Sequence, residues 1–169
     1  MAEMKENIVI RDAQEKDFAG IVALNDAVVE LTSAMDVPRL AELDRLSCLH
    51  KVAVVDGRVA AFLLAMREDA KYPNDNHGWF AARFARFVYV DRVVVGAAYA
   101  GLSIGSLLYR ELFDYARSQG IEVVTCEYKI QPPNIASQRF HDKFGFNEVG
   151  TQWLAGGSKQ VSMQMAVVG

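Results

Sequence analysis

The segment from Phe87 to Arg110 combines three features that together favour binding of a phosphate group. A run rich in β-branched residues ends at Val95 and predicts a strand. Behind it lie a loop of small residues and an amphipathic helical pattern. The small residues of the loop include Gly96, Gly101, Ser103 and Gly105. Glycine lets backbone N–H groups come close to a ligand, and a helix N-terminus carries about half a positive charge toward it. The segment therefore predicts a phosphate cradle, whatever molecule carries the phosphate.

Three interpretations of the loop compete with one another at this point. A dinucleotide site needs G-x-G-x-x-G directly after the first strand, but here Ser103 stands between Gly101 and Gly105. The same three residues match the G-x-S-x-G of a hydrolase nucleophile elbow. An elbow follows its strand at once, whereas residues 96–100 intervene here, which disfavours it. The third interpretation, a tight turn that needs small residues only for packing, is not excluded by the sequence.

A second group of chemistry-bearing residues lies on the helix predicted after Pro133. At about 100° per residue, Asn134, Ser137 and His141 fall within about 60° of arc and form a polar stripe. Asn134 suits the N-cap of that helix, and Ser137 can assist at the third position. The position of His141 is compatible with two roles, that of a structural, hydrogen-bonded histidine and that of a catalytic one. The stripe predicts a ligand wall if the glycine loop binds the same ligand.

An α/β framework is predicted to position these residues. Helices are predicted from Asp12 or Gln14, behind Pro38, and over 103–118 and 134–144. Residues 67–78 are predicted to be irregular, and one helical turn is expected within 79–87. Strands are predicted at 8–10, 50–55, 59–66, 87–95, 121–128, 146–154 and 160–168. The strands at 50–55 and 59–66 are predicted to form a hairpin through Asp56–Gly57. The predicted order is β-α-α-β-β-β-α-β-α-β-β, in a single domain over 8–168 behind a tail at 1–7.

Composition and charge narrow the class of protein. The chain has 169 residues, 51% of them hydrophobic and 23% charged, as in an ordinary soluble domain. Its formal charge of −3 gives no support to nucleic-acid binding. Cys48 and Cys126 lie in apolar segments and predict no disulfide framework. No signal peptide, membrane span or metal-ligand pattern is read, so we expect a cytoplasmic protein without nucleic-acid, membrane or metal partners.

These motifs together resemble the GNAT superfamily, the GCN5-related N-acyltransferases, from Ile8 to Val168. The resemblance is carried by the strand ending VVV, the loop AYAGLSIG and the segment NIASQRFHDKFGF. The last is similar to the family pattern N-x-x-A/S-x-x-x-Y-x-x-x-G-F. In the loop, which is usually R/Q-x-x-G-x-G/A, this chain has Ala100 and Ser103. His141 stands where the family most often has tyrosine.

The resemblance implies a mixed central sheet of about seven strands flanked by about four helices. It also implies transfer of an acetyl or other acyl group from acetyl-CoA (acyl-CoA), as co-substrate, to a primary amine of a small molecule or peptide. The pantetheine arm would lie between splayed strands 87–95 and 121–128, and the loop would hold the pyrophosphate. The cofactor residues carried over are Val93, Val94, Val95, Gly101, Leu102, Ser103, Ile104, Gly105, Ser106, Asn134 and Ser137.

Direct attack makes two proton demands. An amine with a pKa of about 8 to 10 is largely protonated at neutral pH and needs a base. Asp91 and Glu127 are the candidates, although each could instead pair with a neighbouring cation, Arg92 or Lys129. The departing thiolate, with a pKa of about 8.5 by analogy with cysteine, benefits from a proton donor, and His141 is predicted to serve it.

The acceptor pocket is predicted from aromatic and apolar residues around the cofactor cleft. These are Met35, Trp79, Tyr89 and Tyr128, which would suit an amine with an apolar portion, although a plain packing cluster would look the same. A non-catalytic acyl-CoA-binding or sensing module is the alternative function, suggested by the departures at Ala100 and His141. The oligomeric state is left open, a homodimer included.

Overall fold

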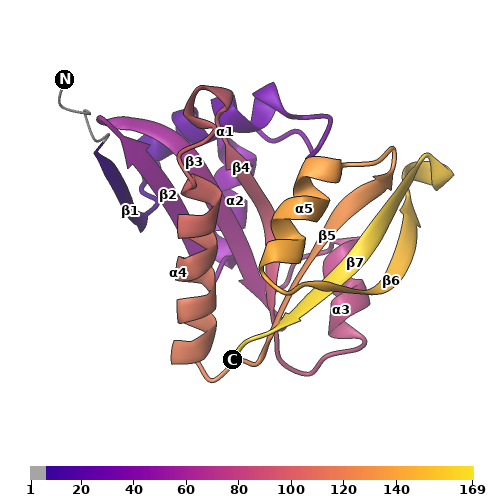
Figure 1. Cartoon of the computed structure of the whole chain (residues 1–169). Helices are drawn as coiled ribbons and strands as arrows, with labels where there is room; N and C mark the ends of the chain where they lie inside the picture. Colours follow the sequence, from indigo (N-terminus) through magenta and orange to yellow (C-terminus); the bar gives the residue numbers. More distant parts are fainter. Residues whose placement is uncertain (1–6) are drawn as a thin grey trace. The chain divides into compact units, whose positions relative to one another are not determined.

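The computed structural model describes residues 7–169, whose strands form a seven-stranded sheet of the order β1-β2-β3-β4-β5-β7-β6 (Figure 1). The strands are β1 (Ile8–Asp12), β2 (Leu49–Val55), β3 (Arg58–Arg67), β4 (Val88–Val95), β5 (Val123–Gln131), β6 (Asn147–Leu154) and β7 (Lys159–Val167). The sheet is mixed, because β4 and β5 pair in parallel while β1–β2, β5–β7 and β6–β7 pair antiparallel. The predicted α/β fold is confirmed.

Five α-helices lie within residues 7–169, one more than the sequence predicts. They are α1 (Phe18–Ala27), α2 (Val37–Leu46), α3 (Asp75–Ala81), α4 (Ile104–Ser118) and α5 (Ile135–Lys143), with short 3-10 turns η1 (Glu15–Asp17), η2 (Ala97–Tyr99) and η3 (Ala155–Gly157). Among the described residues, no helix has the length and apolarity needed to cross a membrane. The residues of the predicted tail lie outside the described part of the chain, except for residue 7.

The chain divides into two compact units. The first runs up to Leu64 and resumes over Arg92–Leu112, and the second comprises Ala65–Asp91 and Phe113–Gly169. The boundaries fall inside β3, between β4 residues, and inside α4, rather than in linkers. Each unit therefore contains segments that are far apart in the sequence.

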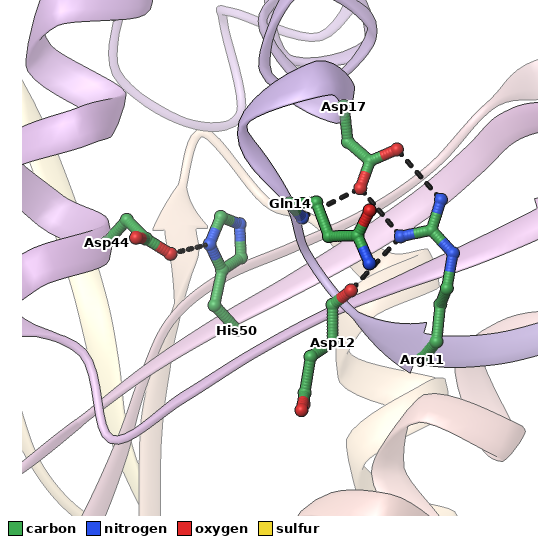
Figure 2. Close-up of polar contacts among 6 residues, drawn as sticks. All are labelled: Arg11, Asp12, Gln14, Asp17, Asp44 and His50. Carbon is green, nitrogen blue, oxygen red and sulfur yellow. Dashed lines mark hydrogen bonds and ion pairs between the residues drawn. The ribbon is translucent and has the colours of Figure 1, made fainter.

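In the first unit, the turn preceding α1 is held by an ion pair and by a capping box. The guanidinium of Arg11 donates to both carboxylate oxygens of Asp17, at 2.7 and 2.9 Å, and the backbone N–H of Gln14 donates to Asp17 at 2.8 Å (Figure 2). Of the two predicted helix starts, Asp12 and Gln14, Gln14 is the N-cap of η1, and α1 itself begins later, at Phe18. In the same view, Nδ1 of His50 on β2 lies 2.7 Å from a carboxylate oxygen of Asp44 on α2.

In the second unit, α3 corrects the expectation that residues 67–78 are irregular. The side-chain oxygen of Asn74 accepts hydrogen bonds from the backbone N–H groups of Asn76 and His77, both at 3.0 Å. Asparagine is a strong N-cap, so a segment rich in asparagine begins a helix here instead of excluding one. The helical turn predicted within 79–87 is the end of this helix, which stops at Ala81.

The bounds of β5 also differ from those predicted. The N–H of Ile121 donates to the carbonyl of Ala116 at 2.9 Å, so Ile121 belongs to the turn that ends α4, and the strand begins at Val123. It continues past Tyr128 because Gln131 pairs with Gln160 of β7 beyond a register shift.

Candidate active site

Within the second unit, the parallel pairing of β4 and β5 is short. It covers Val88 with Val124 and Tyr89 with Thr125, although both strands continue further along the chain. Asp91 and Glu127 each lie two positions beyond the last pair, on the same face of their strands because side chains alternate with period two. The sheet thus places a carboxylate on each strand just beyond the last paired residues.

The carboxylate of Glu127 is held by two hydrogen bonds to one of its oxygens. The hydroxyl of Tyr89 donates to Oε1 at 2.8 Å, and Nδ2 of Asn76 donates to the same oxygen at 3.0 Å. Burial raises the pKa of Tyr89 well above its usual value, and the Glu127 charge adds to this. The phenol therefore stays protonated at neutral pH and remains a donor to the carboxylate.

The carboxylate of Asp91 accepts a hydrogen bond from Tyr72, which lies close to Asn76 in the sequence. The hydroxyl of Tyr72 donates to Oδ1 of Asp91 at 2.5 Å, and Nδ2 of Asn74 lies 3.4 Å from that hydroxyl oxygen. Residues 72–76, just before and within the first turn of α3, thus supply a neutral donor to each of the two carboxylates. Neither the hydrogen bond of Tyr72 to Asp91 nor that of Asn76 to Glu127 was predicted from the sequence.

His141 lies on α5 and is buried, with 4% of its surface exposed. Its Nδ1 donates to the backbone carbonyl of Ser137 at 2.7 Å, since a carbonyl oxygen can only accept. Burial lowers the pKa of His141, so the neutral ring dominates at neutral pH and carries its lone pair on Nε2. The ring can donate from Nε2 only after it has taken up a second proton.

The rest of the polar stripe on α5 orders the helix. The side-chain oxygen of Asn134 accepts from the N–H of Ser137 at 3.2 Å, which confirms the predicted N-cap. Tyr128 of β5 packs beside His141, with ring centroids 5.8 Å apart. The predicted contacts of Asn134 and Ser137 with a cofactor, and of Tyr128 with a substrate, stay predictions.

Trp79 has a packing role in the second unit. A Cβ atom added to Gly150 on β6 would lie 2.5 Å from Cζ2 of the Trp79 ring, so the indole occupies the space that a side chain would need. The guanidinium of Arg83 covers the ring at 3.6 Å from its centroid. Met35, the remaining predicted substrate residue, is buried in the first unit with 5% of its surface exposed.

The glycine loop belongs to the first unit and has the backbone that a phosphate cradle requires. Gly101 and Ser103 adopt positive φ values of 86° and 59°, and α4 begins at Ile104. The first intrahelical bond runs from the N–H of Leu107 to the carbonyl of Ser103, at 3.1 Å. The N–H groups of the preceding turn have no intrahelical partner, as at any helix N-terminus, and they suit an anion. The β4 residues Val93, Val94 and Val95 lie in this unit as well.

The structure brings the predicted residues together in separate groups. Within the second unit, Tyr89 and Glu127 are in contact, and so are Ser137 and His141. Gln152 of β6, which the sequence did not single out, joins the first group through Asn76. Among residues 7–169, no group of three His, Cys, Asp or Glu side chains could hold a metal ion.

The model of the acetyltransferase (GNAT) family matches residues 10–146 of the sequence. The chain belongs to this family. A 59-residue segment is 42% identical to a phosphinothricin N-acetyltransferase of Streptomyces coelicolor, and it spans 35% of this chain and 33% of that relative. The match covers only about a third of the relative's length.

Solved structures of the same fold cover almost all of this GNAT chain. Ard1 from Thermoplasma volcanium superposes with a TM-score of 0.77 at 17% identity, over 95% of this chain and 97% of that one. YncA from Salmonella typhimurium, determined with its cofactor acetyl-CoA, has a TM-score of 0.73 at 21% identity, over 96% and 95%. The ribosomal-protein-S18-alanine N-acetyltransferase from Escherichia coli has a TM-score of 0.72 at 14% identity, over 96% and 94%. At these identities the likeness shows the fold.

Proposed function

We propose that this GNAT protein is an N-acetyltransferase that moves an acetyl group from acetyl-CoA to a primary amine of a small molecule or peptide by direct attack. The observation that carries the proposal is the pair of carboxylates, Asp91 and Glu127, just beyond the last pairing of β4 with β5. Neutral donors orient both of them. Family membership supports the acetyl-transfer chemistry.

Glu127 is the base in this proposal. Its carboxylate accepts hydrogen bonds from two sides, from Tyr89 on β4 and from Asn76 on α3, and the hydroxyl of Tyr72 donates to Asp91. A carboxylate that is already fixed needs little reorganisation when charge moves in the transition state. Glu127 takes the proton of the attacking ammonium, directly or through a water molecule, and Asp91 contributes negative charge that favours a cationic acceptor.

The loop and the start of α4 bind the pyrophosphate of the co-substrate. Backbone N–H groups over 101–106 supply the donors, with the hydroxyls of Ser103 and Ser106 as further donors. Ala100 adds no charge where the family usually has arginine or glutamine, so binding relies on the backbone. Backbone groups of Val93 and Val95 pair with the pantetheine amides, and Asn134 contacts the middle of the arm.

His141 serves the departing thiolate as a proton carrier. Because Nδ1–H is committed to Ser137, the neutral ring first accepts a proton at Nε2, and the imidazolium then donates it from that atom. The nitrogen loses two protons between the ammonium and the amide product. Glu127 takes the first before attack, and the second, released from the nitrogen after attack, reaches the thiolate through His141, so that CoA leaves as the thiol.

The same observation on His141 favours a second candidate, a non-catalytic acyl-CoA-sensing module. A buried, neutral histidine with its one N–H committed to a carbonyl is a weaker acid than a tyrosine hydroxyl free to donate. Such a module would bind CoA without turning over any amine.

Thiol release from acetyl-CoA distinguishes the two candidates. The purified protein is incubated with phosphinothricin, with a peptide that begins with alanine and with simple alkyl amines, because two of the similar proteins are named for acceptors of the first two kinds. We expect thiol release matched by an acetylated amine in the mass spectrum. Saturable CoA binding without thiol release across the panel would contradict the enzyme and favour the sensing module.

The carboxylates can be assigned by a matched pair of variants. We expect Glu127→Gln to lower kcat/KM by about 10²- to 10⁴-fold, the range of general acid–base catalysis, and to remove the ionisation of the base from the pH profile. Asp91→Asn is expected to act mainly on KM for the amine and to keep that ionisation. If instead Asp91→Asn removes the ionisation and Glu127→Gln keeps it, Asp91 is the base.

A further inference from the structure

A chain of two hydrogen bonds leads from Gln152 on β6 through Asn76 to Glu127. The residues of β6 have no part in the chemistry proposed above. Nε2 of Gln152 on β6 donates to Oδ1 of Asn76 at 2.9 Å, and Nδ2 of Asn76 donates to Oε1 of Glu127 at 3.0 Å. All three residues belong to the second unit. Two side-chain amides, one on β6 and one on α3, thus connect to the carboxylate on β5.

The chemistry of the three groups sets the direction of this line. A carboxylate can only accept, so Asn76 must present its NH₂ group to Glu127 and is left with its carbonyl oxygen on the other side. Gln152 must then present its own NH₂ group to that oxygen. Reversing either amide would set two acceptors against each other, so each member fixes the orientation of the next.

The backbone that carries Asn76 is itself fixed. The side chain of Asn74 caps the N–H groups of Asn76 and His77, and Nε2 of His77 lies 2.8 Å from the carbonyl of Arg67 on β3. The imidazole ring packs at 5.6 Å from the ring of Tyr89, which is the second donor to Glu127. Asn76 is 7% exposed, so water competes little for its amide.

We propose that Asn76 and Gln152 are positioning residues that hold the Glu127 carboxylate ionised and in one orientation for proton transfer, a role that rests on the proposed function of Glu127 as base. Neither residue touches the reacting atoms. Asn76 stabilises the charged form of Glu127 through its donated hydrogen bond, and Gln152 acts one step further away by keeping the amide of Asn76 the right way round.

Two nearly isosteric variants test this role. Asn76→Asp replaces the donated hydrogen bond by a second carboxylate, and we expect it to raise the pKa of Glu127 by about one unit or more, because like charges at hydrogen-bond distance disfavour ionisation. Gln152→Glu cannot donate to Asn76, so the amide turns its oxygen toward Glu127, and we expect a smaller rise in the same direction. Asn147→Asp is the matched control, since Asn147 is exposed on β6 and its amide donates to the carbonyl of Gly145.

The readout is the titration of the Glu127 carboxyl by ¹³C NMR, assigned by its disappearance in Glu127→Gln. The pH profile of kcat/KM provides a second readout, in which the ionisation of the base should move by the same amount. A pKa of Glu127 in both Asn76→Asp and Gln152→Glu that equals the value in Asn147→Asp would overturn the positioning role. The titration needs no turnover, so failure of the wild-type protein to release thiol would refute the proposed function alone.

Discussion

At position 103 the backbone adopts a φ of 59°, in the left-handed region that favours glycine, yet the residue is serine. The loop motif of the family usually has glycine at this position, so this chain has a side chain where the motif has none. A residue with a Cβ atom in this region costs about 1–2 kcal/mol relative to glycine-like freedom. The serine therefore introduces local strain directly before α4.

Replacing this serine by glycine should relieve the strain. We expect Ser103→Gly to raise the free energy of unfolding by about 0.5–1 kcal/mol, less than the full strain because glycine also makes the unfolded chain more flexible. Ser106→Gly, in the first turn of α4, is the control and should lower stability by about 0.5 kcal/mol, because glycine is a poorer helix former than serine. Denaturant unfolding measures both. Equal losses in the two variants would show that Ser103 makes contacts worth more than its strain.

At the scale of elements, α3 and β6 are joined by the close approach of Trp79 to Gly150. The glycine lies at a register shift in the pairing of β6 with β7, where Gly150 follows Glu148 in the ladder with Met163 as its partner. The indole of Trp79 fills the space next to the glycine, and the guanidinium of Arg83 stacks on the indole ring. A missing side chain on one element thus makes room for a large one on the other.

Adding a methyl group at this contact should destabilise the protein. We expect Gly150→Ala to lower the free energy of unfolding by about 1–3 kcal/mol, the usual cost of overpacking, because its Cβ would lie within 2.5 Å of the Trp79 ring. Combining it with Trp79→Leu should give a smaller loss than the sum of the two single changes. Gly78→Ala in α3, where an added Cβ meets nothing within 4 Å, should instead stabilise by about 1 kcal/mol. Strict additivity in the double variant would contradict the contact.

Local signals made most elements predictable, and long-range contacts explain what was not. The Asp56–Gly57 hairpin, the cap at Asn134 and the helix behind the glycine loop depend on residues within a few positions of each other, which the sequence displays directly. The contact of Asn76 with Glu127 joins residues 51 positions apart and has no periodicity to reveal it. The one local signal for α3 in the sequence is Asn74, a residue that favours the N-cap of a helix.

At the scale of the whole molecule, the stability of the protein should depend on the ionisation of buried histidines. The Nδ1 atom of His50 contacts Asp44, its ring lies between Phe18 and Phe62, and no protein atom among the described residues hydrogen-bonds to its buried Nε2. Burial lowers the pKa of His50 in spite of the opposing charges of Asp44 and Asp17. The folded protein therefore holds this ring neutral at a pH where the unfolded chain would protonate it.

The sign of the effect follows from proton linkage. Because the unfolded state takes up the proton more readily, we expect the free energy of unfolding to be highest above a pH of about 6.5 and to fall below it, by about 1.4 kcal/mol for each unit by which the folded-state pKa is lowered. His50→Phe keeps a flat ring between its aromatic neighbours and cannot titrate, so it should lose less stability over the same pH range. Urea unfolding as a function of pH measures both proteins, and identical slopes would contradict the prediction. The slope that remains in the variant belongs in part to His141, whose pKa burial also lowers.

The contact between Trp79 and Gly150 also makes the fluorescence of Trp79 a reporter of the structure around α3. The chain has two tryptophans, and Trp153 is 56% exposed, so a quencher such as iodide should reach Trp153 far more readily than the shielded indole of Trp79. Replacing Trp153 by phenylalanine would leave Trp79 as the single tryptophan, on α3 and three residues after Asn76. Its emission would then follow, in real time and without a label, any movement of the helix that supports Glu127.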